Sequence, residues 1–368
     1  MSISGNNKIR VVYFGIYNKS DILTGPEKVC KRVFEEYSKI YKSLFIQYFQ
    51  DGKKYGVIKK LFGYEKTTEI NGNEVLRLGL FRMLYLMAKI NPQVIHILCY
   101  SRYTIFIYLI KIFRKPKIYY NLNGIIRHEN KYYGSEDLIT VFKDIMVENV
   151  IIYFSDRIFY LSEFSKKIVY LYYSPDSGKF SKTINGIDTC FLESGLNHNS
   201  LKEINSIVFI GNIKKEEKGF GLLFESLSKC NLNWKLYVID SINNHQLISS
   251  DYSDKIIMVD KMPPIKMAEF LKNKKVIVSP GKYDTFNISV VEAVSCGMYP
   301  ILTKQTGVSE IIRDFVSASI TDYGDSKTLI KCISDVLNDK LDFELFGDLR
   351  LFSWKKVLMN YYMPYYEQ

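Results

Sequence analysis

The stretch Val276-Ile-Val-Ser-Pro-Gly-Lys-Tyr-Asp-Thr-Phe-Asn-Ile-Ser-Val-Val-Glu-Ala-Val-Ser-Cys-Gly297 decides the fold of this 368-residue chain. Its β-branched start ends at Ser279-Pro-Gly281, which predicts a short buried strand followed by a turn. Apolar residues then recur at helical spacing until Gly297, a residue type common just after a helix. The stretch therefore predicts a strand, a loop and a helix in succession.

Two acidic residues frame the loop and the first turns of that helix. Asp284 lies in the loop, and Glu292 follows eight positions later. In an open α/β sheet such a loop lies at the carboxyl edge of the strands, where ligands bind. The first N–H groups of the helix also point toward any anion at that edge. We therefore expect a ligand site for a molecule with an anionic group.

The pattern resembles the acidic–x7–acidic signature of retaining glycosyltransferases with the GT-B fold, in particular glycosyltransferase family 4. In that family the first acidic residue lies beside the donor sugar and the second holds the ribose of the nucleotide. The resemblance implies Asp284 and Glu292 as the catalytic pair. Two positions depart from the family: Asp284 stands where Glu is usual, and Asn287 stands where a Gly commonly follows the Phe. Asn still tolerates a positive φ.

Glu292 also has a structural interpretation. Ser289-Val-Val-Glu292 fits a capping box, in which the Glu at the third helical position bonds the backbone of the N-cap residue. The sequence leaves both interpretations open.

A second strand, loop and helix lie earlier in the chain. Ser206–Asn212 predicts a strand, Lys214–Gly219 a charged loop and Phe220–Leu227 a helix. In family relatives this loop binds the donor diphosphate through an Arg just after one Gly and a Lys just before the next. The alternative is a solvated Lys/Glu loop.

The match to those two cations is incomplete. Lys218 fits the Lys, whereas Asn212, after Gly211, stands at the Arg position. Either Lys214 or Lys215 is expected to supply the missing charge, because a phosphate needs charge more than a fixed fork of donors. After a strand at 299–302, Thr306–Glu310 is expected to open a further helix toward the same phosphate. The donor-binding residues implied by the resemblance are Gly211, Asn212, Lys214, Lys218, Phe286, Asn287, Ile288, Ser289, Glu292 and Gly307.

The chain begins with another strand and helix. Lys8–Gly15 predicts the strand, and Thr24-Gly-Pro-Glu27 predicts a helix start with a capping box, the helix running to about Ser38. Relatives usually carry a Gly-Gly pair at this loop, near the donor phosphates and the acceptor, and only Gly25 matches. Gly25 is therefore expected either to contact the acceptor or to serve only as a structural cap.

Three more residues are expected near the acceptor. The predicted strand at 117–123 ends at Asn123 and Gly124, where many relatives have a His, and His128 follows on the next loop as its substitute. His96 lies inside a predicted strand at 94–99 and is expected to be a core residue.

Further expected elements are strands at 43–48, 157–161, 234–240 and 255–260, an Asn-Gly hairpin turn at 71–72, and helices at 80–89, 103–113, 135–152 and 325–338, with Ser162 as the N-cap of another helix.

The repeated alternation predicts an α/β protein with two doubly wound parallel sheets and a cleft between them. The resemblance implies that these are the two facing Rossmann-like domains of the GT-B fold. The expected N-terminal, acceptor-binding domain comprises residues 1–182 and a C-terminal helix at about 353–368 that crosses back onto it. The expected nucleotide-sugar-binding domain comprises residues 183–352. An NAD-dependent oxidoreductase is disfavoured, because neither half has Gly-x-Gly-x-x-Gly after its first strand.

Composition and charge bear on compartment and partners. Hydrophobic residues make up 47% of the chain, which excludes a disordered chain. The six cysteines lack C-x-x-C spacing, so we expect reduced thiols with no zinc site or disulfide framework. No leader or membrane-spanning run is apparent, which predicts a cytoplasmic protein. Residues 1–180 hold 28 Lys and Arg against 16 Asp and Glu, and the remainder holds 22 against 23. The basic half predicts attraction to an anionic surface, either a layer of lipid headgroups or a phosphate-bearing acceptor, with a solvated Lys-rich surface as the alternative. No nucleic-acid-binding module is recognisable, so nucleic acid is not an expected partner.

The resemblance implies transfer of a sugar from a nucleotide-sugar donor to a glycan or lipid-linked acceptor, with retention and in surface polysaccharide synthesis. The leaving diphosphate would be stabilised by Lys218 and helix starts, so neither a metal nor another cofactor is expected. The alternative is a non-catalytic, degenerate glycosyltransferase that binds glycan or membrane as a partner subunit.

Overall fold

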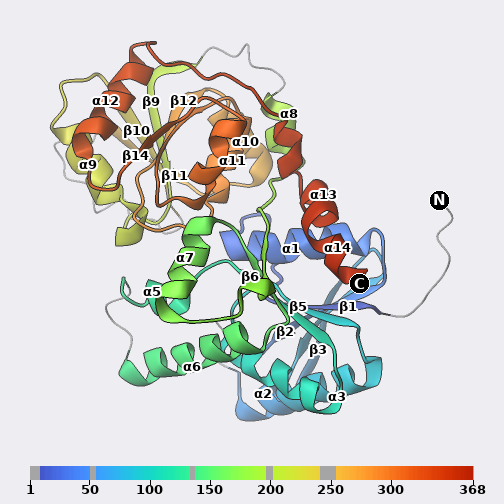
Figure 1. Ribbon diagram of the computed structural model, residues 1–368. Coiled ribbons are helices and arrows are strands. Elements are labelled where there is room, and N and C mark those ends of the chain that lie inside the picture. Colours follow the sequence, from blue (N-terminus) through green and yellow to red (C-terminus); the bar gives the residue numbers. More distant parts are fainter. Residues whose placement is uncertain (1–8, 50–54, 133–136, 196–201, 241–253, 368) are drawn as a thin grey trace. The chain divides into compact units, whose positions relative to one another are not determined.

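The computed structural model describes residues 9–49, 55–132, 137–195, 202–240 and 254–367 (Figure 1). The chain divides into two compact units. Unit 1 comprises residues 1–161, 166–183 and 357–368, and unit 2 comprises residues 162–165 and 184–356. Each unit is an α/β structure built on its own sheet, so the predicted fold class is confirmed at this level.

Unit 1 is built on an eight-stranded sheet in the order β3-β4-β2-β1-β5-β6-β7-β8. Its strands are β1 (Val11–Phe14), β2 (Ser43–Tyr48), β3 (Tyr64–Ile70), β4 (Asn73–Leu78), β5 (Val94–Ile97), β6 (Lys117–Leu122), β7 (Arg157–Tyr160) and β8 (Phe180–Lys182). All neighbours pair in parallel except β3 with β4, which form the predicted hairpin, with a positive φ at both Asn71 and Gly72. The sheet is therefore not purely parallel as predicted, because the Asn-Gly turn adds an antiparallel edge strand.

The helices of unit 1 include those predicted from the sequence and short ones, at 57–62 and 126–129, that were not predicted. They are α1 (Gly25–Ser38), α2 (Val57–Phe62), α3 (Leu80–Ile90), η1 (Arg102–Leu109), α4 (Ile110–Phe113), α5 (Ile126–Glu129), α6 (Leu138–Phe154), α7 (Glu163–Tyr172) and the turn η2 (Ser177–Lys179). The capping box of α1 is confirmed, because the Glu27 carboxylate accepts from the Thr24 N–H at 2.8 Å. The helix predicted at 103–113 is wrong in type, since most of it is 3₁₀ rather than α.

The C-terminal segment contains η8 (Leu349–Phe352), α13 (Trp354–Val357), a π-helical turn (Leu358–Tyr362) and α14 (Met363–Tyr366). From Val357 onward it belongs to unit 1. The Asn121 side-chain amide donates to the Tyr362 hydroxyl at 2.8 Å, and Tyr366 bonds the His96 ring. His96 is fully buried, and that burial lowers its pKa to about 3, so the prediction of a core histidine is confirmed.

Unit 2 is built on a six-stranded, wholly parallel sheet in the order β11-β10-β9-β12-β13-β14. Its strands are β9 (Glu203–Ile210), β10 (Lys235–Asp240), β11 (Ile256–Asp260), β12 (Lys274–Ser279), β13 (Tyr299–Thr303) and β14 (Ser319–Thr321). Its helices and 3₁₀ turns include α8 (Thr189–Gly195), η3 (Glu216–Lys218), α9 (Phe220–Ser228), α10 (Pro264–Leu271), α11 (Ile288–Ser295), η6 (Gly307–Glu310), η7 (Ile312–Asp314) and α12 (Ser326–Leu337). One apolar cluster, which includes Trp234 and Leu223, packs α9 and α12 against the sheet.

The strand order places a topological switch point in each sheet. In unit 1 the chain reverses direction across the sheet between β1 and β5, and in unit 2 between β9 and β12. Ligands of open α/β sheets bind beyond the carboxyl ends of the strands at such points. In unit 2 the two loops that leave this position are residues 211–219 and 280–287, which are the two loops singled out in the sequence.

Candidate functional site

The loops that follow β9 and β12 are in direct contact. The Lys282 N–H donates to the Glu217 carbonyl at 2.9 Å. Gly219 has a φ of 75°, and a Cβ atom there would lie 2.1 Å from the Pro280 carbonyl oxygen. Only glycine permits this approach, because a side chain would clash with backbone in a conformation that L-residues rarely adopt. The two loops therefore form one continuous backbone surface at the switch point.

Lys218 and Asp284 meet on this surface. The Lys218 ammonium lies 2.6 Å from the Asp284 carboxylate, and the two side chains are 31% and 14% exposed. The other Asp284 oxygen accepts from the Phe286 N–H at 3.1 Å. The sequence predicted both residues as ligands but not their pairing, which brings a cation and a carboxylate to a single, partly open point.

The loop after β13 supports the loop that carries Asp284. Asp284 pairs with Thr306 in an isolated parallel bridge, and the Gly307 N–H donates to the Asp284 carbonyl at 2.9 Å. A Cβ atom at Gly307 would lie 2.0 Å from the Thr285 carbonyl oxygen. The helix expected from Thr306 is a four-residue 3₁₀ turn, η6. Because the Gly307 N–H bonds within the protein, its expected use at a phosphate stays a prediction.

Helix α11 begins at Ile288, and its N-cap is Asn287. Asn287 takes the positive φ that the sequence allowed, at 75°, and its side-chain amide donates to the Ser279 hydroxyl at 2.9 Å. Ser289 is therefore the second residue of the helix, not the N-cap. The capping-box interpretation of Glu292 is wrong, because Glu292 is the fifth residue of the helix and that motif requires the third.

Glu292 is nearly buried, with 5% of its surface exposed. Burial, with the negative charges of Asp188 and Glu292 adding to its effect, raises the pKa of the neighbouring Cys190 thiol to about 11. The Cys296 thiol has its pKa raised to about 12 by burial, with Glu292 adding to the effect despite the opposing charge of Lys202. Glu292 therefore lies behind the loop, between α11 and α8, where a carboxylate is costly unless it is bonded.

The remaining residues predicted to bind the donor differ in whether their side chains are buried or exposed. Phe286 is 1% and Ile288 is 8% exposed, so both side chains pack in the interior, whereas Ser289 is partly exposed. Gly211 follows β9 directly, and the Asn212 side chain accepts from the N–H of the exposed Lys214 at 2.9 Å. Asn212 therefore shapes the loop through an Asx turn, which explains how this position is occupied without an Arg.

Three contributors were not predicted as part of this site. The Ser162 hydroxyl donates to the Thr285 carbonyl at 2.9 Å, and the Glu310 carboxylate accepts from the N–H groups of Glu163 and Phe164 at 2.8 and 2.7 Å. One oxygen of the buried Glu217 carboxylate, Oε2, has no hydrogen-bond partner. The sequence signalled Ser162 as an N-cap, and its bond to the Ser165 N–H at 3.1 Å confirms this, but nothing local indicates a partner 123 residues away.

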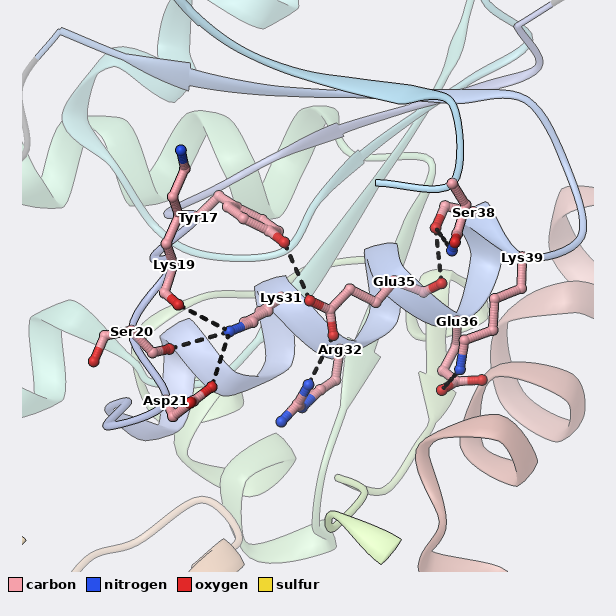
Figure 2. A network of polar contacts seen from close by, with 11 residues as sticks. Tyr17, Lys19, Ser20, Asp21, Lys31, Arg32, Glu35, Glu36, Ser38 and Lys39 are labelled. Carbon is pink, nitrogen blue, oxygen red and sulfur yellow. Dashed lines mark hydrogen bonds and ion pairs between the residues drawn. The ribbon is translucent and has the colours of Figure 1, made fainter. Parts of the chain in front are cut away.

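In unit 1, Gly25 opens α1 after a loop that is held by a lysine. Figure 2 shows the Lys31 ammonium reaching back to the Ser20 carbonyl at 3.1 Å, the Lys19 carbonyl at 3.4 Å and the Asp21 carboxylate at 3.8 Å. A Cβ atom at Gly25 would have no neighbour within 4 Å. Packing therefore gives no reason for a glycine here, and contact with an acceptor stays a prediction.

The other predicted acceptor residues follow β6. The Asn123 side-chain amide donates to the Leu98 carbonyl at 2.6 Å, and Gly124 packs against the Glu129 carboxylate. His128 lies on α5, bonded to the Tyr172 hydroxyl at 2.9 Å, and burial together with the charge of Lys131 lowers its pKa. These residues follow the carboxyl end of β6, whereas Gly25 belongs to the segment that follows β1. In the sheet, β6 lies two strands away from β1.

Part of the chain matches a known protein family. Residues 197–348, which include both loops of the candidate site, match the family described as Glycosyl transferases group 1. The matched residues lie within unit 2 and make up most of it. No curated protein matches the sequence of the chain.

Solved structures resemble almost the whole chain. Sucrose-phosphate synthase from Thermosynechococcus elongatus matches with a TM-score of 0.72 at 13% identity, covering 96% of this chain and 97% of its own. Alr3699/HepE of Anabaena, in complex with UDP-glucose, matches with a TM-score of 0.63 at 12% identity, covering 95% and 94%. WaaG, a glycosyltransferase involved in lipopolysaccharide biosynthesis, matches with a TM-score of 0.63 at 11% identity, covering 95% and 94%. These likenesses confirm the GT-B type of fold, while membership of family 4 and retention stay predictions.

Proposed function

We propose that the protein transfers a sugar from a nucleotide-sugar donor to a glycan or lipid-linked acceptor. The observation that carries the proposal is the meeting of Lys218 and Asp284 at the switch point of unit 2, beside the start of α11. This point lies within the matched Glycosyl transferases group 1 segment. The UDP-glucose in the complex of the similar protein HepE supports a nucleotide-sugar as the donor.

In the proposed reaction the bond between the anomeric carbon and the donor diphosphate breaks, and its electron pair leaves with the diphosphate. Lys218 and the first N–H groups of α11 would stabilise that growing negative charge, which is the electrostatic contribution that enzymes use most. The anomeric carbon then forms a bond to an acceptor hydroxyl oxygen, whose proton is released. No step requires a metal ion, so metal-independence remains part of the proposal.

The two acidic residues take different roles. The Asp284 side chain is 14% exposed and would hold the sugar, whereas the nearly buried Glu292 would accept hydrogen bonds from the ribose hydroxyls. The Asp284 carboxylate is paired with the Lys218 ammonium. For Asp284 to bind a sugar hydroxyl, this ion pair must loosen or break when the diphosphate binds. Retention of the anomeric configuration follows from the resemblance to family 4, and we include it in the proposal on that ground.

We assign acceptor binding to unit 1 and place the reaction in the synthesis of a surface polysaccharide or glycoconjugate at an anionic membrane. The predicted acceptor residues are Gly25, Asn123, Gly124 and His128. Likeness to WaaG, whose name refers to lipopolysaccharide biosynthesis, supports this class of product. In the described part of the chain, no helix is long and apolar enough to cross a bilayer, so the proposed association is peripheral.

The ion pair also favours a second candidate, a non-catalytic protein that keeps the fold and binds glycan. Lys218 and Asp284 satisfy each other in the ligand-free structure, so the pair can serve stability alone. An Asn at the position of the family Arg removes a further phosphate ligand. Binding without turnover would distinguish this candidate from the enzyme.

The test is a panel of nucleotide-sugars. Binding of one donor should raise the melting temperature of the full chain, because a ligand that binds only the folded state stabilises it by mass action. Release of the nucleoside diphosphate is then measured with the donor that binds. Asp284→Asn should retain donor binding and lose release. A donor that binds but is never cleaved would support the non-catalytic candidate, and no binding from the panel would contradict the proposed enzyme.

A further inference from the structure

Helix α3 of unit 1 is apolar around most of its circumference. Arg82 and Lys89 are its only charged residues, yet only Met83 and Met87 are buried. Phe81 and Tyr85, one turn apart, are 48% and 64% exposed. A helix that is apolar on nearly all sides is normally covered by protein or lipid. Within the described residues, α3 therefore presents more apolar surface than its own unit covers.

Helix α2 extends the same surface. None of its six residues is buried, and Val57, Ile58 and Phe62 are 70%, 78% and 55% exposed. The rings of Phe62 and Phe81 stack with their centroids 5.1 Å apart, so the two helices form one patch (Figure 1). We define the α2–α3 face by Val57, Ile58, Phe62, Phe81 and Tyr85. An exposed apolar patch of this kind marks a docking surface for protein or membrane.

The charged residues on α2 and α3 themselves are all basic. Lys59 and Lys60 lie on α2, and Arg82 and Lys89 lie on α3. Residues 75–128, which include α3 and α4, contain no Asp or Glu at all. The neighbouring acids are on β3 and β4, where Glu65 pairs with Arg77 at 3.1 Å, and Glu69 and Glu74 both pair with Lys66. The face is therefore apolar, with a basic surround.

Helix α4 continues this character. The Arg114 guanidinium donates to the Ala88 carbonyl near the end of α3 at 3.4 Å, which places the two helix ends together. Ile112 and Phe113 are 71% and 78% exposed. Exposed aromatic and aliphatic side chains beside Lys and Arg are the composition of helices that lie in the headgroup layer of a bilayer. A second copy of the chain would instead bring like charges together across the same face.

We propose that the α2–α3 face docks on an anionic lipid surface, inserting Ile58, Phe62, Phe81 and Tyr85 among the headgroups while Lys59 and Arg82 contact lipid phosphates. This inference rests on the membrane association proposed above and names the surface that performs it. It does not depend on catalysis. The amphipathic helices provide both apolar insertion and charge, the two contributions that make peripheral binding stable.

The test is co-sedimentation of the full chain with vesicles of phosphatidylcholine alone or with roughly one-third phosphatidylglycerol. The parent should bind the anionic vesicles and lose binding as salt rises, since attraction is screened beyond about 8 Å at physiological ionic strength. Ile58→Ser with Tyr85→Ser should weaken binding about tenfold or more through lost insertion. Lys59→Glu with Arg82→Glu should weaken it about fivefold or more for each charge removed.

A matched control lies on α10 of unit 2, where the adjacent Ile265 and Lys266 are also exposed. Ile265→Ser with Lys266→Glu should bind vesicles like the parent. Absence of binding to anionic vesicles at low salt would overturn the proposal, as would an Ile58/Tyr85 variant that binds like the parent. A lipid-free dimer that dissociates in that variant would assign the face to a second copy instead. Nucleotide-sugar binding by all these variants should match the parent, which separates failure here from failure of the proposed enzyme.

Discussion

At the carboxyl edge of the unit 1 sheet the loops are held mainly by side chains, whereas at the same edge of the unit 2 sheet they are held by backbone. Lys31 fixes the loop before α1, and His128 is held by Tyr172. In unit 2, backbone bonds and glycines join the loops that carry Lys218 and Asp284. Backbone N–H groups and close approach suit a phosphate-bearing ligand. Two sheets of one architecture thus provide two different kinds of surface.

The largest effect should come from blocking the close backbone approach between the two loops of unit 2. Gly219→Ala places a methyl group against the Pro280 carbonyl at a positive φ, so we expect a loss of roughly 2–5 kcal/mol in the free energy of unfolding. Chemical denaturation, followed by a fluorescence probe in unit 2, measures this. A variant as stable as the parent would show that the contact is not needed.

The next effect concerns the charge at the switch point. Lys218→Ala should weaken binding of a nucleoside diphosphate by roughly 1.5–3 kcal/mol, the range for a hydrogen bond to a charged group, and should spare the nucleoside. Calorimetric titration of both ligands provides the comparison. Lys229→Ala, which removes an exposed lysine paired with Glu225 on α9, is the matched control. Equal losses for diphosphate and nucleoside would exclude Lys218 from the phosphate site.

Unit 1 should respond to acid through His96. Burial lowers its folded-state pKa to about 3, below the unfolded value, so the unfolded chain binds the proton first and stability falls as pH drops below about 6.5. Between pH 7 and 5.5 we expect a loss of about 1 kcal/mol from this group. His96→Gln should be less stable at neutral pH but show a smaller decline with acid. An unchanged pH dependence would contradict the burial of a neutral imidazole.

The smallest effect should come from Gly25. Because a Cβ atom there meets nothing within 4 Å, Gly25→Ala should change the free energy of unfolding by no more than about 1 kcal/mol, in the stabilising direction. Its contrast with Gly219→Ala tests whether the two edges differ as described. If Gly25→Ala lowers activity while stability is kept, a ligand approaches this position. A large loss of stability would show that the loop is packed more tightly than the structure indicates.

Sequence periodicity was sufficient for most strands and helices, because alternation and caps such as Thr24 with Glu27 are local signals. The pairing of Lys218 with Asp284 was not predictable, since 66 residues separate them and each alone fitted a ligand role. The N-cap of α11 was misplaced because Ser289 is a common capping residue, whereas Asn287 caps here with a positive φ. The pattern of apolar residues at 102–109 also did not distinguish a 3₁₀-helix from an α-helix.

The central claim is that the second sheet's carboxyl edge binds a nucleotide, with Glu292 as one of its ligands. We would titrate UDP, GDP, ADP and dTDP into the full chain and into Glu292→Gln, with Glu269→Gln on the exposed side of α10 as control. Gln is nearly the same size as Glu and can still accept hydrogen bonds, so the variant should keep its fold, and its melting temperature checks this. The account predicts that one of these nucleotides binds the parent and the control and binds Glu292→Gln about tenfold more weakly, or about 1.4 kcal/mol. Binding of that nucleotide to Glu292→Gln with parental affinity, or no binding of any of the four to the parent, would contradict it.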